Sequence, residues 1–316
     1  MKRPDKLGRL VGSTLGVLAV ALAVGAALAQ TPGRWSKAAA MPEERTEVTV
    51  AALGGRIYVV GGLGGRGGLL EYDPATDQWR ERAKPPFSVH HAGAATVGGR
   101  LYVVGGYSTS WDPVGKTFAY DPARDQWREV SPMPTARGAL AVALVGGRIH
   151  AVGGGGTGRR NTGAHEVYDP GSDRWTSAPP LPTPRDHHAA EVVDGRLYAI
   201  GGRVDGSYAR NLTVNEEYDP RTRQWRTRAP LPTARSGIAA AVLGARIFVF
   251  GGEAPSGTFD QVEAYDPAAD AWSTFSPMPT ARHGLGAAAL GDRIFVISGG
   301  PRPGGSYSPA NEVFRP

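Results

Sequence analysis

Short apolar runs that end in two small residues recur along the chain at almost constant spacing. In the first, residues 56–62, an arginine is followed by Ile57, Tyr58, Val59 and Val60 and then by two glycines. An unbroken run of β-branched and aromatic residues bounded by glycine is typical of a strand that is covered on both faces. The pattern returns at residues 100–106, 148–154, 196–202, 246–252 and 293–299, the last with Ser298 in place of its first glycine.

Each apolar run is preceded by a second predicted strand. These segments are rich in Ala, Gly and Val, and a two-residue turn such as Gly54-Gly55 joins each to the run that follows, as expected for a β-hairpin. Small side chains there fit a place where several sheets converge on one axis. The predicted first strands are 48–53, 92–97, 140–145, 189–193, 239–243 and 285–290.

Aromatic landmarks place two further strands in each repeat. A Tyr-Asp-Pro sequence, first at Tyr72, is followed seven residues later by a tryptophan, and each tryptophan precedes the next small pair by 26 residues. The tyrosine ends a third strand, Asp-Pro begins a turn, and the tryptophan begins a fourth strand. All variation in length lies between the small pair and the tyrosine, so each repeat is a fixed frame with one adjustable loop.

This repeat of about 48 residues, with its glycine pair, Tyr and Trp in order, resembles the kelch repeat. The resemblance covers residues 35–316 and implies an all-β, six-bladed β-propeller with four antiparallel strands per blade. The last repeat stops at Phe314, in the tyrosine position, with no tryptophan after it, whereas Trp35 stands alone at the beginning. The N-terminal strand around Trp35 is therefore predicted to complete the last blade and close the ring.

Strand direction separates two ends of the propeller. The glycine hairpins and Asp-Pro turns share one end, while the variable loops and the connections between blades share the other. Because binding residues concentrate on variable loops held by a rigid frame, we expect function on the loop face.

The N-terminus predicts export. Four basic residues precede a largely apolar segment, and residues 27–29 offer an A-x-A cleavage site, so residues 1–29 are interpreted as a signal peptide before a single propeller domain, 30–316. An uncleaved anchor is the alternative; after cleavage no membrane insertion is expected. The destination would be the periplasm, the cell surface or the extracellular space. Half of the net charge of +6 lies in this leader, so nucleic acid is not an expected partner.

Arginines recur in the connections between blades. Planar, permanently charged guanidinium groups suit carboxylate or phosphate, and kelch propellers of similar pattern often bind acidic peptide segments with such residues. A ring of them at the channel mouth is one interpretation, and hydrogen bonding to loop carbonyls is the other. The residues that match best are Arg137, Arg185, Arg235 and Arg282.

Three further kinds of residue are candidates for ligand binding. Glu191 stands on an innermost strand where the other repeats have alanine, which is either functional or a tolerated channel residue. His187 belongs to a set of histidines in blades two, four and six; alternate blades are expected to lie far apart, so no metal and no cofactor is predicted. In the long loops, Trp111 and Tyr208 would form ligand platforms, although Trp111 could equally cover its own loop.

These features favour an exported binding module that holds a protein or glycan partner, possibly acidic. The alternative is a carbohydrate-active enzyme resembling the N-acetylneuraminate epimerases, in which Glu191, Arg185 and His187 would supply the chemistry. A match to galactose-oxidase-like proteins is excluded, because the chain has no cysteine to cross-link with tyrosine beside copper. Whether catalysis occurs stays open at this stage, as does a purely structural role in an envelope complex.

Overall fold

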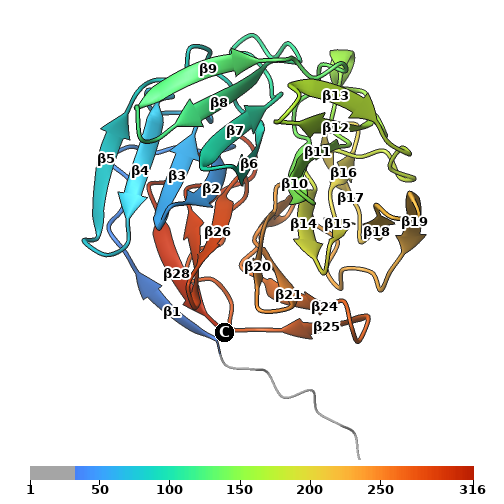
Figure 1. The fold of residues 1–316 in the computed structure, drawn as a ribbon. Helices are drawn as coiled ribbons and strands as arrows, with labels where there is room; N and C mark the ends of the chain where they lie inside the picture. The colour runs from blue at the N-terminus through green and yellow to red at the C-terminus, as the bar shows by residue number, and fades with distance from the viewer. Residues whose placement is uncertain (1–32) are drawn as a thin grey trace, which may run out of the picture.

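The computed structural model describes residues 33–316, which form six four-stranded antiparallel sheets arranged around one axis (Figure 1). The predicted signal peptide, 1–29, lies outside the described residues. The blades, each from its innermost strand outward, are β2 (Thr49–Leu53), β3 (Arg56–Val60), β4 (Leu69–Asp73), β5 (Gln78–Arg82); β6 (Gly93–Val97), β7 (Arg100–Val104), β8 (Thr117–Asp121), β9 (Gln126–Val130); β10 (Ala141–Val145), β11 (Arg148–Val152), β12 (His165–Asp169), β13 (Arg174–Ser177); β14 (Ala189–Val193), β15 (Arg196–Ile200), β18 (Asn215–Asp219), β19 (Gln224–Thr227); β20 (Ala239–Leu243), β21 (Arg246–Phe250), β24 (Val262–Asp266), β25 (Ala271–Thr274); and β26 (Gly286–Leu290), β27 (Arg293–Ile297), β28 (Asn311–Arg315), β1 (Arg34–Lys37).

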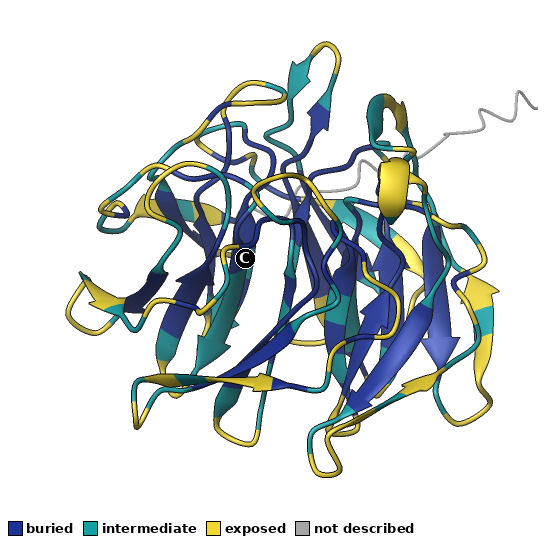
Figure 2. Cartoon of the chain, turned by 90° about the horizontal axis from the view of Figure 1, so that it is seen from above, coloured by how far each residue is buried: buried dark blue, intermediate teal, exposed yellow. Residues whose placement is uncertain are grey.

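Two loops carry small hairpins of their own, in blades four and five. These are β16 (Arg203–Val204) with β17 (Ser207–Asn211), and β22 (Glu253–Ala254) with β23 (Gly257–Thr258). Helical structure in residues 33–316 is limited to the 3-10 turn η1 (Thr157–Arg159), and no helix there could span a bilayer. Figure 2 shows the short turns at one end of the molecule and the longer loops at the other, as predicted.

The second strand of each blade is the most deeply buried. Ile57 to Val60 are at most 3% exposed, because neighbouring blades cover both faces of the sheet. This is the physical reason for the unbroken apolar run before each glycine pair.

The N-terminal strand closes the ring as predicted. β1 pairs with β28, with Trp35 opposite Phe314 and their ring centroids 4.9 Å apart. The indole Nε1 of Trp35 donates to the carbonyl oxygen of Ser276 in blade five at 3.0 Å. The first and last described strands therefore share one sheet, so β28 is covered and the sixth blade has four strands like the other five.

The repeated Tyr, Asp and Trp join neighbouring blades. In blade two, the Tyr120 hydroxyl donates to Asp125 Oδ1 at 2.6 Å, and the same oxygen accepts from the backbone N–H of Ala83 at 2.9 Å. The Trp127 indole donates back to the Ala83 carbonyl at 2.8 Å. The constant seven-residue Tyr–Trp spacing thus preserves an inter-blade contact as well as a turn.

The first residue of each glycine pair is fixed by a close approach. Gly61 has φ +63°, and a Cβ there would lie 2.2 Å from the carbonyl oxygen of Val89 in the next connection. Ser298 adopts the same backbone conformation with φ +64°, and its hydroxyl donates to the Arg45 carbonyl at 2.6 Å. That hydrogen bond accounts for the one departure from glycine.

Candidate functional site at the channel mouth

Six equivalent residues form a closed ring of backbone hydrogen bonds around the axis on the loop face. Each lies two positions before an innermost strand, has φ between +51° and +66°, and donates its N–H to the carbonyl of its counterpart in the preceding blade at 2.6–3.1 Å. We call these residues the mouth ring: Glu47, His91, Ala139, His187, Gly237 and Gly284. Since backbone atoms make the ring, its side chains are free to differ.

The predicted arginine ring is not an open anion site. Arg137, Arg185, Arg235 and Arg282 are all 0% exposed. Arg185 shows the common arrangement: its guanidinium donates to Glu216 Oε2 at 2.6 Å and to the carbonyls of Thr183 and Ala199, each at 2.8 Å. Because its terminal nitrogens bond inside the protein, each of these arginines holds the connection between blades against the strands of its sheet.

A glutamate at one equivalent position of the repeat is the partner of the arginine in four blades. Arg137, Arg235 and Arg282 pair with the glutamate two residues before the tyrosine position, as Arg185 does. These glutamates therefore belong to the repeated frame. Of the two interpretations of the arginines, the structure supports hydrogen bonding to loop carbonyls and adds a buried ion pair to it.

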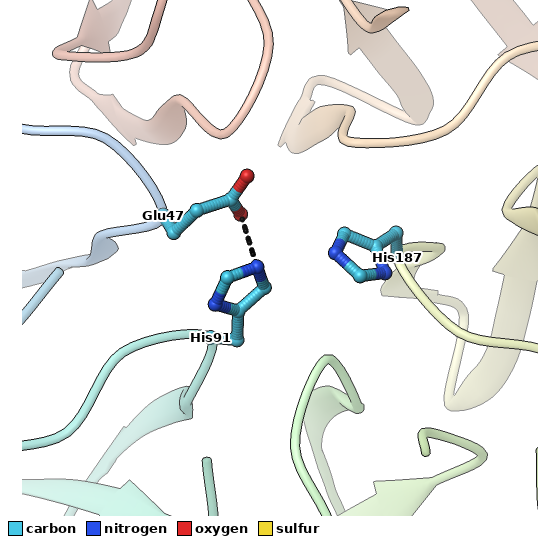
Figure 3. A group of neighbouring side chains, drawn as sticks. All are labelled: Glu47, His91 and His187. Atoms are coloured by element: carbon cyan, nitrogen blue, oxygen red, sulfur yellow. Dashed lines mark ion pairs between the residues drawn. The ribbon is translucent and has the colours of Figure 1, made fainter. Parts of the chain in front are cut away.

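Side chains of the mouth ring converge above the axis. Figure 3 shows Glu47, His91 and His187 pointing toward one another from three blades. Glu47 Oε2 lies 3.2 Å from His91 Nε2, and the ring centroids of His91 and His187 are 4.9 Å apart. The expectation that histidines on alternate blades lie far apart is therefore wrong, because the ring draws their backbones together at the axis.

Charged residues extend this group sideways. Arg203 NH1 donates to Glu253 Oε1 at 2.6 Å, and Arg203 NH2 lies 2.7 Å from His187 Nε2. Asp186 Oδ1 lies 2.5 Å from His187 Nδ1, and His283 Nε2 lies 3.7 Å from Glu47 and 3.6 Å from Glu253. We call the connected set the mouth cluster: Glu47, His91, Asp186, His187, Arg203, Glu253 and His283.

Burial and charge act in opposite directions on the ionisable groups here. Burial is the largest influence on the Asp186 carboxyl, yet His187, Arg203 and Asn161 together lower its pKa to about 2. His283 and Arg203 likewise outweigh burial and lower the pKa of Glu253. Burial lowers the pKa of His90 to about 4 and that of His91 well below its ordinary value, which favours neutral imidazoles. Within the mouth cluster, these shifts in pKa favour the ionised carboxylates of Asp186 and Glu253 and the neutral imidazole of His91.

Glu191 lies deeper, in the axial channel. It lines a cavity of about 300 Å³ formed otherwise by alanine, valine, leucine and threonine side chains of the innermost strands. None of the residues lining that cavity lines the pocket of about 90 Å³ at the mouth, which includes His187. With Arg185 buried against Glu216, the structure does not bring Glu191, Arg185 and His187 together.

The Glu191 carboxyl makes no side-chain ion pair among the described residues. Burial raises its pKa to about 8, opposed only by the Val192 backbone N–H. A carboxyl whose pKa is raised on folding binds a proton more tightly in the folded protein, so the protein loses stability as pH rises from the unfolded value through 8.

We expect the Glu191→Gln variant to match the parent near pH 4 and to be more stable above pH 8, by on the order of a few kcal/mol. Melting temperatures of both proteins across this range test the prediction. A constant difference between them would show that the Glu191 carboxyl does not titrate differently in the folded and unfolded states.

The long loops place aromatic side chains and arginines around the mouth. Trp111 is 41% exposed, its ring centroid lies 4.4 Å from that of His90, and the Arg159 guanidinium lies 4.5 Å from its ring. Tyr208 is half-buried, with the Arg203 guanidinium 5.7 Å from its ring. Trp111 and Arg159 have φ of +64° and +56°, a conformation that costs a bulky residue energy and is concentrated at functional sites.

Sequence reasoning missed Glu47, Asp186, Arg203 and Glu253. A signal for them appears when the six repeats are aligned, so that equivalent residues form a column. Arg203 and Glu253 follow the glycine pair directly, in a column that otherwise holds Leu63, Tyr107, Gly155 and Gly300. Asp186 and His283 share the column that bridges to it across the loop face. Columns whose residues differ between blades mark the mouth, whereas columns that repeat mark the frame.

The architecture and its polar mouth define a six-bladed propeller with an individual site on a repeated frame. A Kelch motif model matches residues 44–86 and 88–134, and a KLHDC2/KLHL20/DRC7 Kelch-repeats domain model matches residues 177–300. The chain belongs to the kelch-repeat family.

Comparison with other proteins adds to the fold only. A solved structure titled "Structure of YjhT" is similar to this chain, with 16% sequence identity and a TM-score of 0.77 over 88% of this chain and 97% of that chain. None of the curated proteins compared matches the sequence.

Proposed function

We propose that the protein is an exported binding module that holds a hydroxyl-rich glycan over the mouth cluster. The observation that carries this proposal is that the side chains of the mouth ring differ from blade to blade, unlike those of the repeated frame. The backbone ring forms equally well with alanine or glycine in three blades, so Glu47, His91 and His187 are not needed to build it. Side chains that the frame does not require, gathered in one polar pocket, are candidates for ligand recognition.

The chemistry of the surrounding loops supports a sugar ligand. An exposed indole provides an apolar face, while Glu47 and His187, which line the pocket at the mouth, offer polar atoms for hydrogen bonds. Alternating apolar faces and hydroxyl groups on a sugar ring complement such a surface. The burial of the inter-blade arginines removes the main reason to expect an acidic ligand, although Arg159 and Arg160 are exposed on the loop face.

The test is binding of the protein to an array of neutral and acidic glycans, followed by titration with the best ligand. We expect Trp111→Ala and Tyr208→Ala each to weaken binding about 10-fold. Neither substitution should change the melting temperature appreciably, since Trp111 is exposed and Tyr208 is half-buried in a loop.

Tyr307→Ala is the matched control. Tyr307 is also 41% exposed, but its ring lies beside Gly64 in the loop of blade one. Equal binding by the parent, the control and both loop variants would show that Trp111 and Tyr208 do not contact the glycan, and would contradict the proposed binding surface. Conversion of a bound sugar between anomers, followed by NMR, would replace the binding proposal with the enzymatic one.

A further inference from the structure

We propose that Glu47, His91 and His187 form a binding site for a divalent transition-metal ion, of which zinc is the representative. This inference goes beyond glycan binding and does not depend on it. The three ligand atoms lie within 4.8 Å of one another, and the side chains are 12%, 4% and 8% exposed (Figure 3). The site is therefore largely enclosed by protein, with an opening toward the loop face.

The geometry requires a small closure. Zinc bonds to imidazole nitrogen and carboxylate oxygen are about 2.0–2.2 Å long, which places tetrahedral ligand atoms about 3.4 Å apart. Glu47 Oε2 and His91 Nε2 are already 3.2 Å apart. The His187 ring nitrogen lies within 4.8 Å of both atoms, so a shift of on the order of 1 Å at that nitrogen would bring the three to tetrahedral spacing.

Both histidines have the outer partners that a metal ligand needs. A ligating histidine ordinarily donates its second ring N–H to a carboxylate or carbonyl, which fixes the tautomer. His187 Nδ1 faces Asp186 Oδ1 at 2.5 Å, so its Nε2 carries the free electron pair. Arg203 NH2 donates to that Nε2 at 2.7 Å, consistent with this assignment.

A chain of hydrogen bonds fixes the second tautomer. His90 Nε2 must donate to the Ser108 carbonyl, 2.9 Å away, which leaves His90 Nδ1 to accept from His91 Nδ1 at 2.6 Å. In a neutral His91 the electron pair on Nε2 then faces the Glu47 carboxylate at 3.2 Å. Two acceptors placed opposite each other repel, and a cation between them converts that repulsion into two bonds.

The charge of the mouth cluster also favours a cation. It contains three carboxylates, Glu47, Asp186 and Glu253, against one guanidinium, that of Arg203. Carboxylates thus outnumber guanidinium groups in a largely enclosed site, where charge interactions are strong, and this excess favours a bound cation.

Arg203 occupies the place of the cation in the structure described. To let a metal bind at His187 Nε2 the guanidinium must move away from that nitrogen, and Glu253 and Asp186, now 2.6 Å and 3.4 Å from it, are the anionic partners it would turn to. Three protein ligands leave a fourth position open, as in zinc sites that bind an exogenous molecule.

The experiment is calorimetric titration of the untagged protein, stripped of metal by chelation, with Zn²⁺. Parallel titration with Co²⁺ reports coordination through visible absorption. We expect one ion per chain, at least 10-fold weaker binding for each of Glu47→Gln, His91→Gln and His187→Gln, and about 10- to 100-fold weaker binding for Asp186→Asn. Asp112→Asn, an exposed carboxylate on the same face, and His150→Gln, in a buried pair within blade three, should bind as the parent does.

Melting curves without metal establish that each variant is folded. If one variant does not fold, the substitutions of the other two ligands still test the site. No one-to-one binding of Zn²⁺ or Co²⁺ by the parent would overturn the proposal. So would loss of binding in His283→Gln and Glu253→Gln with full retention in His91→Gln and His187→Gln, because the ion would then use Glu47, Glu253 and His283, the other three-ligand group at the mouth.

Discussion

Deletion of residues 33–40 is expected to lower the melting temperature by about 10 °C or more. The segment contains β1, the outermost strand of blade six, and without it β28 becomes an exposed edge. The deletion removes the Trp35 contacts with Phe314 and Phe250 and the hydrogen bond to Ser276. Removing a fully buried aromatic costs about 3–5 kcal/mol; Trp35 is partly buried, but the deletion also removes the strand that carries it. Each kcal/mol shifts the melting temperature of a domain this size by about 2–4 °C.

Trp35→Ala isolates the side chain from the strand. We expect Trp35→Ala to lower the melting temperature by a large part of the decrease caused by the deletion. Trp111→Ala, which removes an equal volume from an exposed loop, should leave the melting temperature nearly unchanged. Scanning calorimetry on the four proteins compares them directly. An unchanged transition in the deletion would mean that the other five blades hold the ring without the closing strand.

The frame could be predicted from sequence because it is written six times. A buried strand, a glycine pair, a tyrosine and a tryptophan at constant spacing leave few alternatives, and the lone Trp35 fixes the closure. Each of these signals is local, and repetition separates it from chance. The strands found in the structure begin and end within one or two residues of those predicted.

The burial of the arginines was harder to predict because a guanidinium is equally suited to an internal carboxylate and to an external anion. The repeats nevertheless contain the answer. Blade two lacks the arginine and has Val89, and it also lacks the glutamate and has Phe118. Blade one keeps the arginine, Arg45, but has Leu70 in the glutamate position, and there Glu43 supplies the carboxylate. Each buried arginine of the frame therefore has an internal carboxylate partner, since either charge alone would be costly to bury.

The mouth could not be assembled from sequence because its geometry comes from closure. His91 and His187 are 96 residues apart, and only the backbone ring places them within 5 Å. The periodicity of the repeat assigns each histidine to a blade, but it does not determine how close the blades come to one another at the mouth. The same closure leaves Glu191 lower in the channel, away from His187, although the two are four residues apart in the chain.

The second large effect is expected from Arg235→Met, which should reduce the free energy of unfolding by about 3–5 kcal/mol. Arg235 is fully buried and bonds to Glu263 and to the Gly251 and Val249 carbonyls. Its removal leaves the Glu263 carboxylate buried without its cation, and that cost exceeds the loss of the ion pair itself. Urea denaturation measures the change.

A double variant separates the charge from the packing. Arg235→Met with Glu263→Leu imitates the apolar pair of blade two and should recover about 1–3 kcal/mol of the loss, because no unpaired charge remains. The Gly251 and Val249 carbonyls still lack their donor, so recovery should be incomplete. Arg246→Met, which removes a half-exposed arginine 3.7 Å from Asp266 in the same blade, should have little effect. Strictly additive losses in the double variant would show that Arg235 stabilises the blade through the loop carbonyls alone. Recovery of part of the free energy of unfolding in the double variant would show that the buried Arg–Glu pair, repeated in four blades, stabilises the protein as a pair.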